Sequence, residues 1–210
     1  MMTVTIEFIS DFICPWCYIG KTRLEKVAAI LEPEINLRVL SRPYELYPAL
    51  PTGGLPRTDF SKKAKPGMGK SLKKEAEKEG IKLNYRLIER IPNSLEAHRL
   101  VWLAKQESLQ YELTKRIFHG YFEEGNDIEK LEYLAELAKE VGLSDDIIRP
   151  FCDSRTGQEE LRTYLLSLKE EEFVSVVPSL KFGGKFLLPG LQEESVWISY
   201  IRRAARLQEK

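Results

Sequence analysis

The chain has 210 residues, of which 43% are hydrophobic, so it is long enough to bury one sizeable core. Lys and Arg together number 32, as do Asp and Glu, and the formal net charge is therefore zero. Without a global basic field, the chain is not expected to bind nucleic acid or an anionic membrane. Residues 1–10 (MMTVTIEFIS) do not resemble a secretory signal, and no segment approaches the roughly 18 apolar residues of a membrane span. We therefore expect a cytoplasmic protein.

The first forty residues predict a strand, a helix and a second strand. Residues 3–9 (TVTIEFI) are rich in β-branched and aromatic types and alternate in polarity, as strands do. Apolar residues then recur at helical spacing from Pro15 to about Leu31. Proline suits a first helical turn because its missing N–H would have no partner there. Residues 35–40 (INLRVL) alternate again and are expected to form the second strand.

The middle of the chain is different in character. Residues 43–57 contain four prolines and a Gly-Gly pair, which indicate an irregular connection. From about residue 59 to residue 172 the hydrophobic period is helical, and glycines punctuate the expected helix ends. The predicted helices cover 59–79, 94–106, 108–123, 128–141, 144–152 and 155–171.

A period of two returns near the end of the chain. Residues 179–182 (SLKF) and 185–188 (KFLL) flank Gly183-Gly184, which is a hairpin signal, and a last helix is predicted over 193–208. The predicted fold class is α/β. Its domain organisation is a split unit made of residues 1–43 and 173–210, with a connection and an inserted helical domain over residues 44–172.

Two of the three cysteines form the motif Cys14-Pro15-Trp16-Cys17 at the start of the first predicted helix. Unpaired N–H groups and the positive end of the helix dipole stabilise a thiolate at that place. Cys14 is therefore predicted to be an exposed nucleophile. Cys17, one turn further in, is predicted to be a buried resolving thiol that attacks a mixed disulfide formed by the first cysteine. Pro15 and Trp16 are expected to provide substrate contacts.

A close cysteine pair would also suit a zinc site or a structural disulfide. Zinc needs a second pair of ligands, and Cys152, His98 and His119 are solitary and far apart in the sequence. A structural disulfide is uncommon in the reducing cytosol. We therefore favour redox exchange and expect no metal. In this interpretation Cys152 is a small buried hydrophobe and His98 a core or interface histidine.

Four further residues are expected to border the two cysteines. Val177-Pro178 precedes the strand 179–182, and a cis peptide bond before this proline would expose the backbone of Val177 for pairing with an extended substrate. Glu7 and Asp11 are candidates to accept the proton of the resolving thiol. The alternative is that both carboxylates are ordinary exposed residues.

Three segments together resemble the DsbA-like thiol–disulfide oxidoreductases, and within them the FrnE subgroup. They occur in the same order and are 11–21 (DFICPWCYIGK), 92–104 (PNSLEAHRLVWLA) and 177–192 (VPSLKFGGKFLLPGLQ). The resemblance implies a thioredoxin fold with an inserted helical domain. It also implies that Cys14 and Cys17 are the redox pair, that Pro178 is a cis-proline opposite them, and that Asn93 borders the site.

The resemblance leaves two activities open. The expected one is disulfide exchange with protein or small thiol substrates, with no bound cofactor and with glutathione considered as a co-substrate. The alternative is a glutathione-dependent isomerase or transferase of the 2-hydroxychromene-2-carboxylate isomerase or kappa-class type. These enzymes resemble the chain in architecture but typically have serine where Cys14 stands, so the cysteine pair favours disulfide exchange. A homodimer is kept as an alternative to a monomer.

Overall fold

The computed structural model describes residues 2–58, 67–170, 174–184 and 186–208. Both ends of the chain contribute to one sheet, as the sequence predicted. The first half of that unit is strand β1 (Met2–Ser10), helix α1 (Pro15–Leu31) and strand β2 (Ile35–Pro43). The second half is strand β5 (Ser179–Phe182), strand β6 (Phe186–Pro189) and helix α9 (Glu194–Gln208). Lys185, with which the last strand was predicted to begin, lies outside the described residues.

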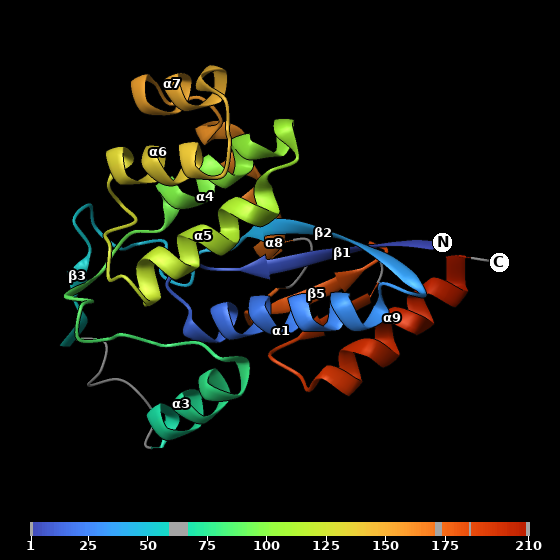
Figure 1. The fold of residues 1–210 in the computed structure, drawn as a ribbon. Helices are drawn as coiled ribbons and strands as arrows, with labels where there is room; N and C mark the ends of the chain where they lie inside the picture. The colour runs from blue at the N-terminus through green and yellow to red at the C-terminus, as the bar shows by residue number, and fades with distance from the viewer. Residues whose placement is uncertain (1, 59–66, 171–173, 185, 209–210) are drawn as a thin grey trace.

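The four strands form a sheet in the order β2-β1-β5-β6 (Figure 1). Strand β1 is central and pairs in parallel with β2, so α1 is the crossover between them. It pairs antiparallel with β5, which in turn pairs antiparallel with β6. Gly183 and Gly184 both adopt a positive φ in the β5–β6 turn, which explains the glycine pair there.

The chain between these two parts is mainly helical. In Figure 1 helices α4 to α7 are stacked above the sheet, while α1 and α9 lie below it. The elements are α3 (Met68–Glu79), α4 (Leu95–Leu103), a 3-10 helix (Ala104–Glu107), α5 (Gln110–Phe122), α6 (Leu131–Glu140), α7 (Asp145–Asp153) and α8 (Gln158–Glu170). Buried apolar residues of the sheet and of these helices form one continuous core, so the helical segment packs directly on the sheet.

Helix α6 begins at Leu131 rather than at residue 128, and two other helices begin directly after glycines with a positive φ. Helix α3 follows Gly67, whose φ is +82°, and the predicted residues 59–66 lie outside the described part of the chain. Helix α8 begins at Gln158 rather than at residue 155, because Gly157 has a φ of +78° that cannot continue a right-handed helix.

One strand pair was missed, with one strand in the stretch predicted to be irregular and the other in the segment predicted to be mainly helical. Strand β3 (Leu55–Pro56) pairs antiparallel with β4 (Arg90–Ile91). The guanidinium of Arg90 donates hydrogen bonds to the backbone carbonyls of Gly53 and Gly54, which ties the two segments together. Strands of two residues carry no hydrophobic period, so the sequence pattern contains no signal for them.

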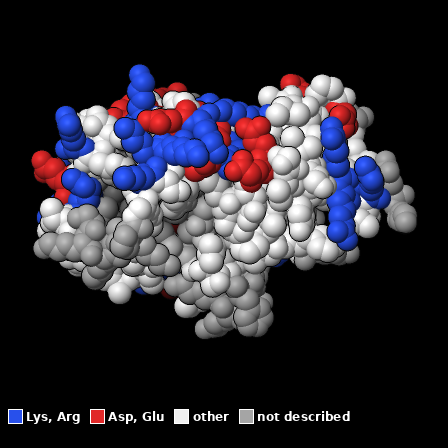
Figure 2. All heavy atoms as spheres, turned by 90° about the horizontal axis from the view of Figure 1, so that it is seen from below, with Lys and Arg blue, Asp and Glu red and all other residues white. Residues whose placement is uncertain are grey.

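The surface carries charges of both signs. Seen from below, where α3 lies, Lys and Arg side chains are interspersed with Asp and Glu across one band of the face (Figure 2). This mixture agrees with the zero net charge of the chain. None of the helices in the described part of the chain is both long and apolar enough to cross a membrane.

Candidate functional site

The two cysteines lie at the N-terminus of α1, directly after the central strand. Cys14 is the N-cap residue in an extended conformation, and Pro15 occupies the first turn. The carbonyl oxygen of Cys14 accepts hydrogen bonds from the N–H groups of Cys17 and Tyr18, at 3.0 and 3.3 Å. Cys14 therefore lies at the N-terminal end of the helix, and Cys17 lies one turn behind it.

The accessibility of the pair differs in part from the prediction. Cys17 is completely buried, as expected, and both cysteines are free thiols. Cys14 has only 5% of its surface exposed, so the prediction of an exposed nucleophile is wrong for this conformation. Burial, and then the neighbouring Cys14 sulfur, raise the pKa of the Cys17 thiol well above its ordinary value. At neutral pH the second cysteine is therefore a protonated thiol.

The loop before β5 lies opposite Cys14. The Val177–Pro178 peptide bond is cis, as predicted. The Cys14 thiol donates a hydrogen bond to the carbonyl oxygen of Val177, with 3.9 Å between sulfur and oxygen. On α1, a Cβ atom added to Gly20 would lie 3.2 Å from Cγ of Pro178. Glycine at this position therefore lets the proline ring approach the helix closely.

Asp11 is a buried carboxylate next to Cys17. Its Oδ1 accepts a hydrogen bond from the N–H of Ile13 at 3.3 Å, and its Oδ2 accepts one from the N–H of Leu46 at 2.6 Å. Nε2 of the buried His98 lies 3.5 Å from Oδ1 and has no hydrogen-bond partner within the described residues. The negative charge of Asp11 is among the causes that raise the pKa of Cys17. Asp11 is thus a buried residue rather than an ordinary exposed one.

The other two polar candidates have different surroundings. Glu7 forms an ion pair with Arg42 of the neighbouring strand, with 2.7 Å between Oε2 and Nε. The side chain of Asn93 donates to the carbonyl oxygen of Leu50 at 2.8 Å and accepts from the N–H of Leu95 at 2.9 Å. Asn93 is not among the described residues that line the cavity at Cys14, and its contacts hold the start of α4 in place.

A cavity of about 490 Å³ opens at Cys14. Its wall is mainly apolar and comes from distant parts of the chain. The described lining residues are Ile13, Cys14, Pro15, Trp16, Leu46, Tyr47, Arg57, Met68, Gly69, Leu72, Tyr85, Ile88, Ile91, Tyr121 and Phe122. Sequence reasoning identified the cysteine motif but missed the residues between 46 and 122, because nothing in the spacing of these residues links them to the motif.

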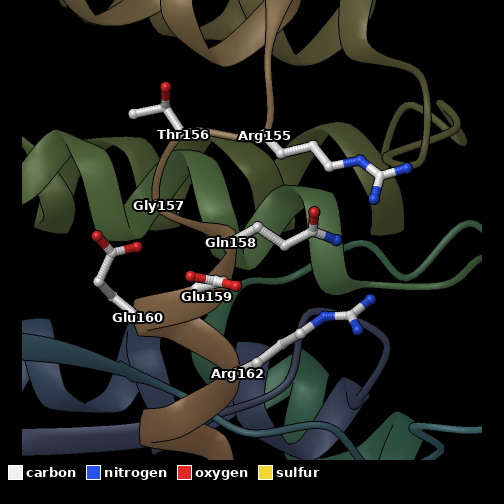
Figure 3. A pocket seen from close by; sticks show the side chains of 7 residues that line it. All are labelled: Arg155, Thr156, Gly157, Gln158, Glu159, Glu160 and Arg162. Carbon is white, nitrogen blue, oxygen red and sulfur yellow. The ribbon is translucent and has the colours of Figure 1, made fainter.

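A second hollow, of about 560 Å³, lies at the start of α8 and is lined by Arg155, Thr156, Gly157, Gln158, Glu159, Glu160 and Arg162. In Figure 3 Arg155, Gln158 and Arg162 extend to one side of the ribbon, and Thr156 and Glu160 extend to the other. It contains neither cysteine of the motif. Over the described ranges, no group of three or more His, Cys, Asp or Glu residues could hold a metal ion.

The fold and the cysteine pair define the class of protein. The model of the DSBA-like thioredoxin domain family matches residues 5–196, and the chain therefore belongs to this family. Among curated proteins it is similar to the uncharacterized protein YwbO of Bacillus subtilis (strain 168). The two are 30% identical over 196 residues, which cover 93% of this chain and 94% of that protein.

Solved structures share the fold over nearly the whole chain. A probable DsbA oxidoreductase from Streptomyces coelicolor has a TM-score of 0.82 and 24% identity, with 96% of this chain and 89% of that chain covered. The cytosolic disulfide reductase DsbM from Pseudomonas aeruginosa, solved with GSH, has a TM-score of 0.67 and 18% identity, with 96% and 99% covered. The expected thioredoxin-like α/β fold is thereby confirmed.

Proposed function

We propose that the protein is a thiol–disulfide oxidoreductase in which Cys14 is the nucleophile and Cys17 the resolving thiol. The observation that carries this proposal is the position of Cys14, which caps α1 and lies 3.9 Å from the carbonyl oxygen of Val177. The N-terminus of a helix in general favours a negatively charged group, as attack by a thiolate requires. Membership of the DsbA-like family supports the reaction class.

The reaction has two exchange steps. The Cys14 thiolate attacks one sulfur of a substrate disulfide, the substrate S–S bond breaks, and one substrate thiolate leaves with the bonding electron pair. Cys17 then attacks the Cys14 sulfur of the mixed disulfide and releases the second thiolate. The protein dithiol is oxidised by two electrons and the substrate disulfide is reduced to two thiols. With the direction reversed, the oxidised pair would oxidise substrate thiols.

The second step requires a proton acceptor, because the Cys17 thiol is protonated at neutral pH. We assign this role to Asp11, which is buried next to it and whose charge acts on it. Glu7 is the weaker candidate, since it is already paired with Arg42. The apolar surface of Trp16 and Pro15, together with Val177 and Pro178, would contact the substrate on either side of Cys14.

We further propose a cellular location, a co-substrate and a division of roles between the two parts of the chain. The likeness to the cytosolic disulfide reductase DsbM supports a cytoplasmic location for this enzyme. The structure of DsbM was determined with GSH, which supports glutathione as a co-substrate rather than a bound cofactor. The three sequence segments support assignment to the FrnE subgroup. We propose that residues 1–43 and 173–210 form the redox scaffold and that residues 44–172 supply most of the cavity wall.

The test is a turnover assay with 2-hydroxyethyl disulfide and glutathione, in which oxidised glutathione is recycled by glutathione reductase and NADPH. The wild type is expected to turn over, and Cys14→Ser is expected to lose at least 99% of the activity. Cys152→Ser is the matched control, because this cysteine lies on α7 away from the motif, and it is expected to keep full activity. Full activity in Cys14→Ser would refute the proposal. Full activity in Cys17→Ser alone would show that glutathione, rather than Cys17, resolves the mixed disulfide on Cys14 in this assay.

A further inference from the structure

The cavity beside Cys14 has the size of a small-molecule site. Its volume of about 490 Å³ lies within the roughly 300–1,000 Å³ typical of such sites. Cys14 itself is 5% exposed, so a bulky partner has little access to its sulfur. The lining of the cavity includes Met68 and Leu72 of α3, and this helix is held against α1 by buried ion pairs. Arg23 lies 2.7 Å from both Glu75 and Glu79.

Aromatic rings line this cavity around the sulfur. Trp16 belongs to the motif itself, while Tyr85 and Tyr121 come from the segment before α4 and from α5. Burial and the neighbouring Cys14 raise the pKa of the Tyr85 hydroxyl, and Arg57 acts on it in the opposite direction. Tyr85, Cys14 and Arg57 are therefore close enough to interact electrostatically. Flat aromatic walls of this kind favour a flat apolar body in the ligand.

Arg57 is the single charged side chain among the described residues that line the cavity. Its Nε donates a hydrogen bond to the carbonyl oxygen of Ile88 at 2.8 Å, which fixes the guanidinium at the wall. No carboxylate in the described ranges is paired with it. A partly buried guanidinium that has no acidic partner among the described residues is suited to bind a carboxylate of a ligand.

We propose that the substrate is a small disulfide, or its thiol, with an aromatic-sized apolar body and a carboxylate that binds Arg57. This inference rests on the proposed function, because the sulfur of the ligand must reach Cys14. In the reductive direction the thiolate of Cys14 displaces one aryl thiolate, and Cys17 displaces the second. The disulfide gains two electrons, the cysteine pair loses two, and the two cysteine thiols release their protons.

The test compares two aromatic disulfides in single-turnover reactions with the reduced protein. 5,5′-Dithiobis(2-nitrobenzoate) carries a carboxylate on each ring, whereas 2,2′-dithiodipyridine is uncharged. The variant Arg57→Gln is expected to lower the second-order rate constant for the dicarboxylate about tenfold, and that for the neutral disulfide less than twofold. Arg86→Gln is the matched control, since Arg86 is exposed on the segment that carries Tyr85 and does not line the cavity. It is expected to change neither rate more than twofold.

Several results would overturn the inference. One is an equal decrease in the rate constants for both reagents in Arg57→Gln, and another is no decrease in the rate constant for the dicarboxylate. The third is a decrease in Arg86→Gln that matches the decrease in Arg57→Gln. The effect of size is measured separately: insulin disulfides are expected to react with the reduced wild type at least tenfold more slowly than oxidised glutathione, which is also an unactivated alkyl disulfide. Equal rates would contradict it. Failure of the proposed function would look different, because the wild type would then react with neither aromatic reagent through Cys14.

Discussion

Lys21 on helix α1 links the stability of the protein to pH. It lies one turn after Cys17 on α1, with 1% of its side chain exposed. Its Nζ is 2.8 Å from Oε1 of Glu25 and 3.1 Å from the centre of the Tyr111 ring. Burial lowers the pKa of Lys21 from 10.5 to about 8, although Glu25 acts in the opposite direction. The folded protein therefore binds this proton less tightly than the unfolded chain does.

The sign of the effect follows from this difference. Between pH 8 and pH 10.5 the unfolded chain carries the proton and the folded protein does not, so the free energy of unfolding rises with pH. A pKa of about 8 instead of 10.5 corresponds to about 3 kcal/mol, at about 1.4 kcal/mol for each pKa unit. This contribution is absent below pH 8 and is complete above pH 10.5.

The assay is urea unfolding of the reduced wild type and of Lys21→Met at pH 7 and pH 10.5. Other groups titrate in both proteins, so their effects cancel in the difference between the two free energies of unfolding. That difference is expected to move by about 3 kcal/mol in favour of the wild type at the higher pH. Lys73→Met, at an exposed position on α3, is the control and is expected to show no such change. A difference that stays constant with pH would refute the reasoning.

Three further predictions concern the exchange chemistry. Because the pKa of Cys17 is raised, resolution of a Cys14 mixed disulfide in Asp11→Asn, which lacks the assigned proton acceptor, should accelerate about tenfold per pH unit between pH 6 and pH 8, measured by stopped-flow release of the second thiol; a flat profile in this variant would argue against a protonated Cys17. Asp11→Asn should slow this step at least tenfold and leave the first step within twofold, whereas equal slowing of both would remove Asp11 as the proton acceptor. Gly20→Ala should not raise the melting temperature despite a helix propensity gain of about 1 kcal/mol, and should lower turnover, because its Cβ would press on Pro178. A melting temperature several degrees higher with full turnover would show that the contact is not tight.

The regular elements were largely predictable because their signals are local. Helix α1 has the predicted bounds from Pro15 to Leu31, and β5 has the predicted bounds 179–182. The cysteine motif at a strand-to-helix junction can likewise be identified from neighbouring residues alone. Helix starts were less predictable where the backbone is set by one residue, as at Gly157 before α8.

The surroundings of the cysteines were not predictable, because they depend on long-range packing. Arg57 follows a short strand in an irregular stretch, and Tyr85 precedes another, so neither has a periodic pattern around it. The burial of Cys14 has the same origin, since the cavity beside it is lined by residues from the distant segments 46–57, 68–91 and 121–122. His98 was interpreted correctly as a buried residue, but its position beside Asp11 appears only in the folded chain.

The central claim is that Cys14 attacks a disulfide and Cys17 resolves the product, and trapping of the intermediate tests it most directly. Reduced Cys17→Ser, Cys14→Ser and wild-type proteins are mixed with 2,2′-dithiodipyridine, and their intact masses are measured. We expect Cys17→Ser to retain one thiopyridyl group on Cys14, and Cys14→Ser to acquire none at Cys17 on the same timescale. The wild type is expected to form the Cys14–Cys17 disulfide and to carry no adduct. An adduct on Cys17 in Cys14→Ser that forms as fast as the adduct on Cys14 would contradict the account.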